Sequence, residues 1–392
     1  MIIPRKGALL ATAIVLAACS GNGGGSLPDK DGGTHDTTAV DSEPADAPGP
    51  DAIADGSHND ADGAAAADAF PSHDVPLDHG TPPAALRVPA EWEPHAATWL
   101  QWPGPYEKEM RPAFARVINV IRQYEPVHLL VGTKGDQKDA SQFLQAQGVP
   151  QDNITWHTLP VDSAWMRDNG PVYVLVQGTL ALQDWKFDAW GGNFGTDVPF
   201  ENDDAVPALV AQYVGLEVQD KSAYVLERGN LELNGADTLV LNWDCQDDRN
   251  PGLTAAQHEK VLSDAFGVTR IIWAYGHDPL DGTTGHIDGT ARFISADTIA
   301  IGNNGTATDE DLAVACEQAG LHVVRFDGDS NWLVGNGFVL AGAEGDPALD
   351  EAFEAQLSAF FPGRDVHLVD VVSIWDSGGG VHCVTNDQPA GP

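Results

Sequence analysis

Residues 375–386 read WDSGGGVHCVTN, and this stretch holds the most informative residue of the chain. Three consecutive glycines allow backbone angles that other residues resist, and they let a ligand approach the main chain closely. The apolar alternation over 381–385 predicts a short strand. Cys383 would then lie at the start of a strand, beside a glycine turn, which suits a nucleophile. The alternative is an unreactive thiol, since cysteine often packs as a small hydrophobic residue.

The composition bounds the size of the core and the class of partner. The chain has 392 residues, of which 42% are hydrophobic, enough for one large core or two smaller ones. Its formal net charge is −38, and residues 85–392 carry 45 acidic against 17 basic side chains. No nucleic-acid partner is expected, because a phosphate backbone requires a basic face. The same charge would attract a small cationic substrate.

The N-terminal region predicts export. Residues 1–18 have the form of a signal peptide, with an apolar run too short for a membrane span. The run ends in Leu-Ala-Ala-Cys, which resembles the lipobox of bacterial lipoproteins and implies a lipid on Cys19. Residues 19–84, rich in Gly, Ala, Asp and Pro, predict a disordered acidic tether. We therefore expect a protein of the bacterial cell envelope, in the periplasm or at the cell surface, that contacts the membrane only through this lipid. An ordinary secretory signal is the alternative.

Residues 85–392 predict one α/β domain. Helical periodicity is present at Glu107–Tyr124, 138–147, 204–214, 254–266, 308–319 and 348–360. Strand-like runs lie near 97–102, 126–131, 154–158, 171–176, 238–242, 270–274, 291–301, 321–325, 337–341 and 366–372. From the third helix on, a spacing of roughly 45–55 residues indicates repeated β-rich units with one helix each. The pattern alone fits a stacked array or a doubly wound sheet.

Two further segments carry candidate chemistry. Asp168 lies in WMRDNGP, where Gly-Pro ends an element; a carboxylate there can hold a guanidinium by two parallel hydrogen bonds, or it can merely form a turn. His286 and Asp288 are two residues apart, and on a strand they would project from the same face as an acid–base pair, a surface pair or a metal-ligand pair. Glu227 and Glu232 flank a Gly-Asn pair, and either could enter a cleft.

The cysteines outside the glycine stretch leave alternatives open. No two of the four cysteines have C-x-x-C spacing, so a zinc site is not indicated. Cys245 and Cys316 are either buried thiols or a disulfide.

Together these residues meet the needs of guanidinium chemistry. Guanidinium is a poor electrophile because its charge is delocalised. Asp168 and Asp288 would hold and neutralise it, and the thiolate of Cys383 would attack its central carbon. His286 would protonate the departing ammonia and then deprotonate a water molecule.

These motifs also carry a resemblance. Residues 86–392 resemble the agmatine deiminase and bacterial peptidyl-arginine deiminase family, within the pentein superfamily. The matching segments are VPAEWEPH at 88–95, WMRD at 165–168, AWGG at 189–192, RNP at 249–251, GHID at 285–288 and GGGVHC at 378–383. The resemblance implies a five-bladed β/α propeller of ββαβ repeats.

The resemblance also assigns residues. It implies that Cys383 is the nucleophile, that His286 is the general acid and base, and that Asp168 and Asp288 bind the guanidinium. It places further residues beside the substrate: Trp165, Glu227, Trp190 and Gly379. It implies neither a metal nor an organic cofactor, and a homo-oligomer is possible.

The implied activity is hydrolysis of agmatine to N-carbamoylputrescine and ammonia, through a covalent thiouronium intermediate on Cys383. Deimination of peptidyl arginine to citrulline is the alternative, which export would favour. A non-catalytic surface lipoprotein that binds guanidino compounds is a hypothesis of another class. A papain-like hydrolase is disfavoured, because His286 precedes Cys383 and no papain signature is present.

Overall fold

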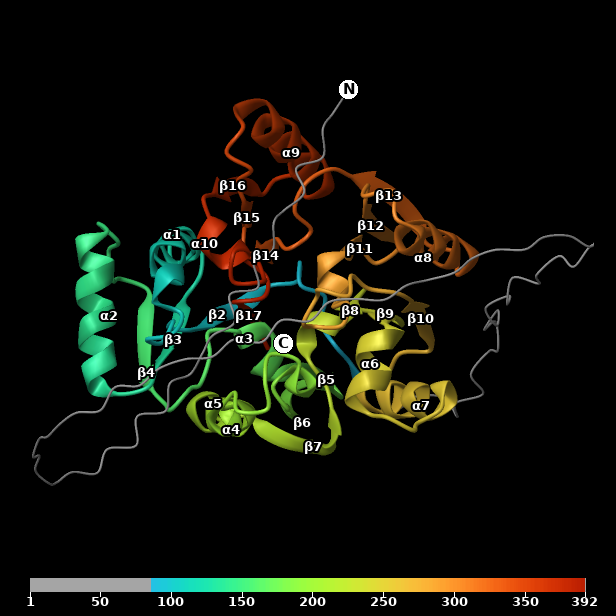
Figure 1. The fold of residues 1–392 in the computed structure, drawn as a ribbon, viewed down its shortest axis with the longest axis horizontal. Helices are drawn as coiled ribbons and strands as arrows, with labels where there is room; N and C mark the ends of the chain where they lie inside the picture. The colour runs from blue at the N-terminus through green and yellow to red at the C-terminus, as the bar shows by residue number, and fades with distance from the viewer. Residues whose placement is uncertain (1–85, 392) are drawn as a thin grey trace, which may run out of the picture. The chain divides into compact units, whose positions relative to one another are not determined.

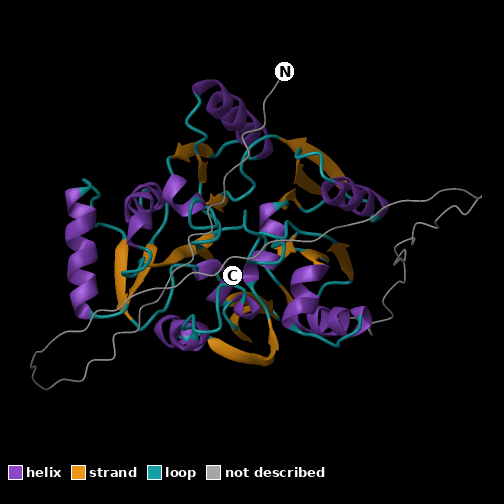
Figure 2. Ribbon diagram, in the orientation of Figure 1, coloured by secondary structure: helices purple, strands orange, loops and turns teal. Residues whose placement is uncertain are grey.

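The computed structural model describes residues 86–391. The predicted signal peptide, Cys19 and the predicted tether fall outside these residues. Within residues 86–391 the strands form five sheets. Figures 1 and 2 show these sheets arranged around a common centre, with the longer helices on the outside. No helix in this part of the chain is both long and apolar enough to cross a membrane.

Each sheet contains the same repeat. Two antiparallel strands are followed by a helical connection and a third strand that runs parallel to the second. The sheets are β1 (Leu86–Arg87), β5 (Val172–Val176), β6 (Thr179–Lys186) and β7 (Glu217–Val225); β8 (Glu232–Leu233), β9 (Thr238–Asn242) and β10 (Arg270–Ala274); β11 (Ala291–Ser295), β12 (Thr298–Gly302) and β13 (His322–Phe326); β14 (Leu333–Gly335), β15 (Phe338–Gly342) and β16 (Asp365–Val369); and β17 (Asn386–Pro389), β2 (His95–Gln101), β3 (Val127–Val131) and β4 (Ile154–Thr158). This is the expected five-bladed propeller of ββαβ units.

The helices connect the second and third strands of each repeat. These connections are α1 (Arg111–Ile121), α5 (Val206–Val214), α7 (Ala255–Phe266), α8 (Ala307–Gln318) and α9 (Pro347–Phe360). The remaining helices are α2 (Lys134–Ala146), α3 (Met166–Asn169), α4 (Glu201–Asp204), α6 (Trp243–Arg249) and α10 (Val372–Trp375), with 3₁₀ turns η1 (Lys108–Met110), η2 (Trp190–Gly192), η3 (Arg228–Asn230) and η4 (Ile287–Gly289). Each of five apolar clusters combines residues of two neighbouring blades, so the core of the domain lies largely between the blades.

The fifth sheet joins the two ends of the domain. Strand β17, close to the C-terminus, pairs antiparallel with β2, and Asn386 lies opposite Trp99. The pairing requires the preceding turn, which contains Cys383, to lie at the centre of the propeller. The glycine-rich stretch is therefore positioned by the closure of the ring.

Local sequence explains where the helices begin and end. Helix α8 starts with a capping box, in which the hydroxyl of Thr306 accepts from the Asp309 backbone N–H and Asp309 accepts from the Thr306 N–H. Helix α7 ends at Gly267, whose φ of 72° is the left-handed conformation that terminates helices. Helix α1 has proline in its first turn, so it begins at Arg111, after η1, instead of at the expected Glu107.

Two local expectations were wrong. Residues 381–384 form turns, and the strand begins only at Asn386. His286 and Asp288 do not alternate on a strand either, because Asp288 lies in the 3₁₀ turn η4 and His286 directly precedes it. Both segments bend because they enter the first strand of a blade, where the chain must turn at the centre.

Candidate active site

Five candidate residues come from equivalent places in four of the five repeats. Each of the five lies within five residues of the strand that opens its repeat. Asp168 precedes β5, Glu227 precedes β8, His286 and Asp288 precede β11, and Cys383 precedes β17. Since the opening strands lie near the centre (Figure 1), the fold brings together residues that are far apart in the sequence.

Cys383 is held in its turn by main-chain contacts. Its N–H donates to Oδ1 of Asn331 (3.0 Å), and its carbonyl oxygen accepts from the N–H of Arg167 (3.1 Å). Its sulfur lies 3.8 Å from Oδ2 of Asp288. Burial, Asp288 and Asp168 raise the pKa of the thiol well above its usual range. The thiol is therefore protonated at neutral pH until a cation offsets the two carboxylates.

The glycine stretch allows a close approach beside the sulfur. A Cβ on Gly379 would lie 2.4 Å from a ring carbon of Trp165 and 3.1 Å from Sγ of Cys383. Only glycine therefore leaves room for the half-buried indole of Trp165 next to the thiol.

His286 is a buried imidazole between two carboxylates. Its Nε2 donates to Oε2 of Glu227 (2.6 Å), and its Nδ1 lies 3.6 Å from Oδ1 of Asp168. Burial lowers the pKa of His286, but Asp168, Cys245 and Glu227 outweigh burial and raise it well above the usual value. His286 is therefore protonated near neutral pH, as a general acid must be.

Glu227 supports His286. Its carboxylate accepts from Nε (2.6 Å) and from a terminal nitrogen (3.3 Å) of Arg249 as well as from His286. Burial raises the pKa of Glu227, but its bonds to His286 and Arg249 produce a net lowering. Because the Glu227 carboxylate is 0% exposed and is paired with both Arg249 and His286, the geometry gives Glu227 the role of orienting His286, whereas the resemblance placed it beside the substrate.

The two aspartates differ in their partners. Asp168 accepts from the indole N–H of Trp190 (2.9 Å) and from the N–H of Gly229 (3.2 Å). Burial raises the pKa of Asp168 to about 6. Asp288 accepts at Oδ2 from Nδ1 of His382 (2.7 Å), and this bond outweighs burial and lowers the pKa of Asp288.

A strained turn aims Trp190 at Asp168. Ala189 and Trp190 both have positive φ angles, 59° and 56°, which are unusual for residues other than glycine. Such conformations persist where the surrounding structure fixes them. Here the turn directs the indole N–H into the site.

Within residues 86–391, one group of three His, Cys, Asp or Glu side chains has the spacing of metal ligands, and it includes His286. Ligand atoms of Glu227, Cys245 and His286 lie within 4.8 Å of one another. Arg249, however, already neutralises Glu227. Cys245 and Cys316 are buried free thiols, which decides between the two alternatives for this pair.

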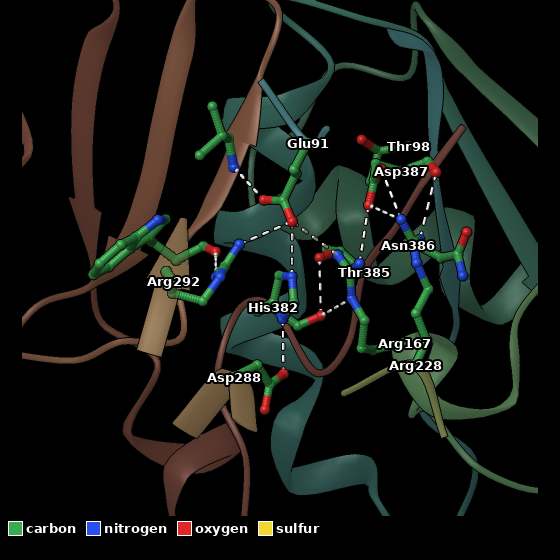
Figure 3. A network of polar contacts seen from close by, with 12 residues as sticks. Glu91, Thr98, Arg167, Arg228, Asp288, Arg292, His382, Thr385, Asn386 and Asp387 are labelled. Carbon is green, nitrogen blue, oxygen red and sulfur yellow. Dashed lines mark hydrogen bonds and ion pairs between the residues drawn. The ribbon is translucent and has the colours of Figure 1, made fainter. Parts of the chain in front are cut away.

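Sequence reasoning did not single out several residues at the centre. They are Glu91, Asn331 and His382, although Glu91 and His382 lie inside matched motifs. Figure 3 shows Glu91 between Arg292 and His382, with Asp288 on the other side of His382. Aligning the repeats on their opening strands would have found Asn331 and His382, because these residues lie two and four residues before β14 and β17.

A partly exposed thiol, a protonated imidazole and two carboxylates around one centre define an enzyme that hydrolyses guanidino groups. The comparisons agree. A sequence model described as Porphyromonas-type peptidyl-arginine deiminase matches residues 87–322 and 329–389, and the chain belongs to this family.

The relatives include agmatine deiminases. The agmatine deiminase of Stutzerimonas stutzeri is 30% identical over 77% of this chain and 95% of its own length. A putative agmatine deiminase of Streptomyces avermitilis is 32% identical, with 78% and 97% covered.

Solved structures share the fold. The agmatine deiminase of Enterococcus faecalis superposes with a TM-score of 0.70 at 24% identity, covering 78% of this chain and 96% of that one. A putative arginine deiminase from Porphyromonas gingivalis gives 0.64 at 25% identity, with 78% and 99% covered.

Proposed function

We propose that this enzyme hydrolyses agmatine to N-carbamoylputrescine and ammonia. The observation that carries the reaction class is the convergence of Cys383, His286, Asp168 and Asp288 at the centre of the propeller. The choice of agmatine is supported by relatives of that name at 30% identity and by the acidic domain, which suits a doubly charged cation.

The first half-reaction consumes the guanidinium. Asp168 and Asp288 bind its N–H groups, and its positive charge lowers the pKa of the Cys383 thiol, which loses its proton to solvent. The thiolate attacks the central carbon and forms a C–S bond. Protonated His286 then gives its proton to one nitrogen, the C–N bond breaks, and ammonia leaves. A thiouronium remains on Cys383.

The second half-reaction restores the enzyme. Neutral His286 takes a proton from water, and the resulting hydroxide attacks the thiouronium carbon. The C–S bond breaks and the thiolate leaves; the hydroxyl proton passes to the sulfur, which restores the thiol and leaves the neutral urea group of the product. His286 is protonated again, held by Glu227 at 2.6 Å. No step requires an oxidant or a further reactant.

Peptidyl arginine is the competing substrate, because the family is described by that activity. An ammonia assay distinguishes the two with agmatine, free arginine and N-acetylarginine amide as substrates. We expect agmatine to give the highest kcat/KM. A higher kcat/KM for N-acetylarginine amide than for agmatine would show that peptidyl arginine is the substrate.

We further propose that the chain is exported and anchored by lipid on Cys19, on the basis of the Leu-Ala-Ala-Cys sequence at 16–19. In cells grown with a labelled fatty acid, the label should be incorporated into the full-length chain but not into its Cys19→Ser variant. Equal labelling would contradict the anchor.

A further inference from the structure

The hydrogen bonds behind the nucleophile form a chain that ends at Asp288. Glu91 Oε2 accepts from Nε2 of His382 (2.8 Å), and Nδ1 of His382 donates to Oδ2 of Asp288 (2.7 Å). The imidazole is 1% exposed, and so is Asp288. His382 thus links a distant carboxylate to the one that lies 3.8 Å from the sulfur.

Both ring nitrogens of His382 lie within hydrogen-bond distance of a carboxylate oxygen. A neutral imidazole has only one N–H, so both bonds form together only when both nitrogens carry protons. Burial, Arg167 and Arg292 outweigh Glu91 and Asp288 and lower the pKa of His382. The second proton is therefore bound less tightly than in a free histidine, and it joins the ring to both carboxylates when it is present.

Glu91 is itself fixed from other blades. Its Oε1 accepts from the N–H of Val334 (2.8 Å), and its Oε2 accepts from a terminal nitrogen of Arg292 (2.9 Å). Arg292 is held in turn by Glu232 (3.1 Å). Figure 3 shows Glu91 at the junction of these contacts. Because Glu91 has no freedom to follow a moving imidazole, it clamps the ring of His382.

The clamp leaves one oxygen of Asp288 available. His382 bonds only to Oδ2 of Asp288, and no group within residues 86–391 donates a hydrogen bond to Oδ1. An aspartate held through one oxygen has a fixed rotamer, so the other oxygen points in a constant direction. This is the arrangement that a planar, charged amidine or guanidine requires.

We propose that His382, clamped by Glu91, is a positioning residue that sets the orientation of Asp288 for binding the guanidinium. This inference rests on the proposed function, because it takes Asp288 to bind the guanidinium. It gives His382, which directly precedes the nucleophile, a role other than transferring a proton to the substrate.

The test compares two alkylating agents of similar size on the full chain. Chloroacetamidine carries an amidinium, which Asp288 would bind, whereas chloroacetamide is neutral. Both lose chloride as the sulfur of Cys383 forms a thioether, and the thiol proton passes to solvent. The ratio of their second-order inactivation rates measures how strongly the site favours an amidinium, independently of agmatine turnover.

We expect His382→Gln to lower this ratio by about ten-fold, the lower end of what outer partners of metal ligands contribute. Glu91→Gln should lower it in the same direction but less, and it serves as the second variant if His382→Gln does not fold. His258→Gln is the control, since His258 is equally buried but bonds to Tyr224 in another blade. An unchanged ratio in both folded site variants would overturn the proposal.

Non-additivity separates positioning from general structural damage. In an Asp288→Asn background, His382→Gln should change the ratio by less than about two-fold, because the group through which it acts is already altered. A full ten-fold loss in that background would contradict the proposed route. If the unaltered enzyme releases no ammonia from agmatine, the proposed substrate is wrong, while the alkylation ratios still decide the role of His382.

Discussion

Replacing Glu227 by glutamine should shift the alkaline limb of the pH–activity profile to lower pH. The structure places its carboxylate 2.6 Å from Nε2 of His286, and the resulting charge-assisted bond helps to raise the pKa of His286. Such bonds contribute about 1.5–3 kcal/mol. At about 1.4 kcal/mol per pKa unit, the pKa of His286 should fall by about 1–2 units.

The sign follows from the role of His286 as an acid. The protonated form is active, so a lower pKa removes activity at a lower pH. In the Glu227→Gln variant, kcat/KM should therefore decline about 1–2 pH units earlier on the alkaline side. The pH profile of ammonia release measures this, and an NMR titration of the His286 ring gives the pKa directly.

A stability loss of up to about 3–5 kcal/mol will accompany the change, because the buried guanidinium of Arg249 loses its buried partner and keeps only the half-exposed Asp248. Glu125→Gln is the matched control. Glu125 is equally buried and lies 3.2 Å from the ring of His95, outside the site. It should lose stability without shifting the activity profile. If the alkaline limb of Glu227→Gln stays in place, the assignment of His286 as the acid is refuted.

Three further predictions test the site and its support. Gly379→Ala should lower kcat/KM by more than about ten-fold, because the new methyl group would lie 2.4 Å from a ring carbon of Trp165. Gly289→Ala is the control: a methyl group there has no neighbour within 4 Å and should change the fold and its stability little. Similar melting temperatures and activities in the two variants would contradict the steric argument. Trp190→Phe removes the 2.9 Å bond to Asp168 and should reduce kcat/KM by about 10- to 100-fold, measured by ammonia release; a value near that of the unaltered enzyme would remove this bond from the account. Asp387 bonds to the buried guanidinium of Arg167 and the partly buried one of Arg228, which lower its pKa to about 2. Its stabilising effect is therefore present above about pH 4 and is lost as the pH falls toward 2. Asp387→Asn should lower the unfolding free energy by about 3–5 kcal/mol at pH 7, and a difference from the parent that fails to shrink in urea unfolding at low pH would contradict the assignment.

Periodicity predicted the peripheral elements well. The six expected helices are present, and each begins within four residues of its expected start. These helices have one apolar face and recognisable caps, so local sequence specifies them. The expected strand at 291–301 is a hairpin of β11 and β12 whose tight turn lies between Ser295 and Thr298.

Elements with weak apolar patterns were missed. Strand β7 (Glu217–Val225) is mostly exposed or half-buried, so its residues do not alternate in polarity. Helix α6 (Trp243–Arg249) carries three aspartates and a glutamine and forms where β9 ends. Parallel pairing with β6 decides β7, whereas α6 begins where the side chain of Asn242 caps it by accepting from the Asp244 N–H.

The chemistry of the centre was only partly predictable. Cys383, His286, Asp168 and Asp288 were identified by residue type, but the strand geometry expected for the His-x-Asp pair was wrong. The roles of Glu91, Asn331 and Arg249 depend on contacts between residues more than 20 positions apart, which no local pattern reveals. Of these contacts, the bond from Cys383 to Asn331 is the one that involves the turn before β17, which the pairing of β17 with β2 positions.

The most direct test of the central claim is mass spectrometry of the unaltered enzyme quenched in acid during turnover of agmatine. Because the mechanism passes through a thiouronium on Cys383, we predict that the peptide containing Cys383 gains the mass of this adduct and that the Cys383→Ser variant shows no adduct. The absence of any adduct on Cys383, together with ammonia release by the Cys383→Ser single variant, would contradict the account.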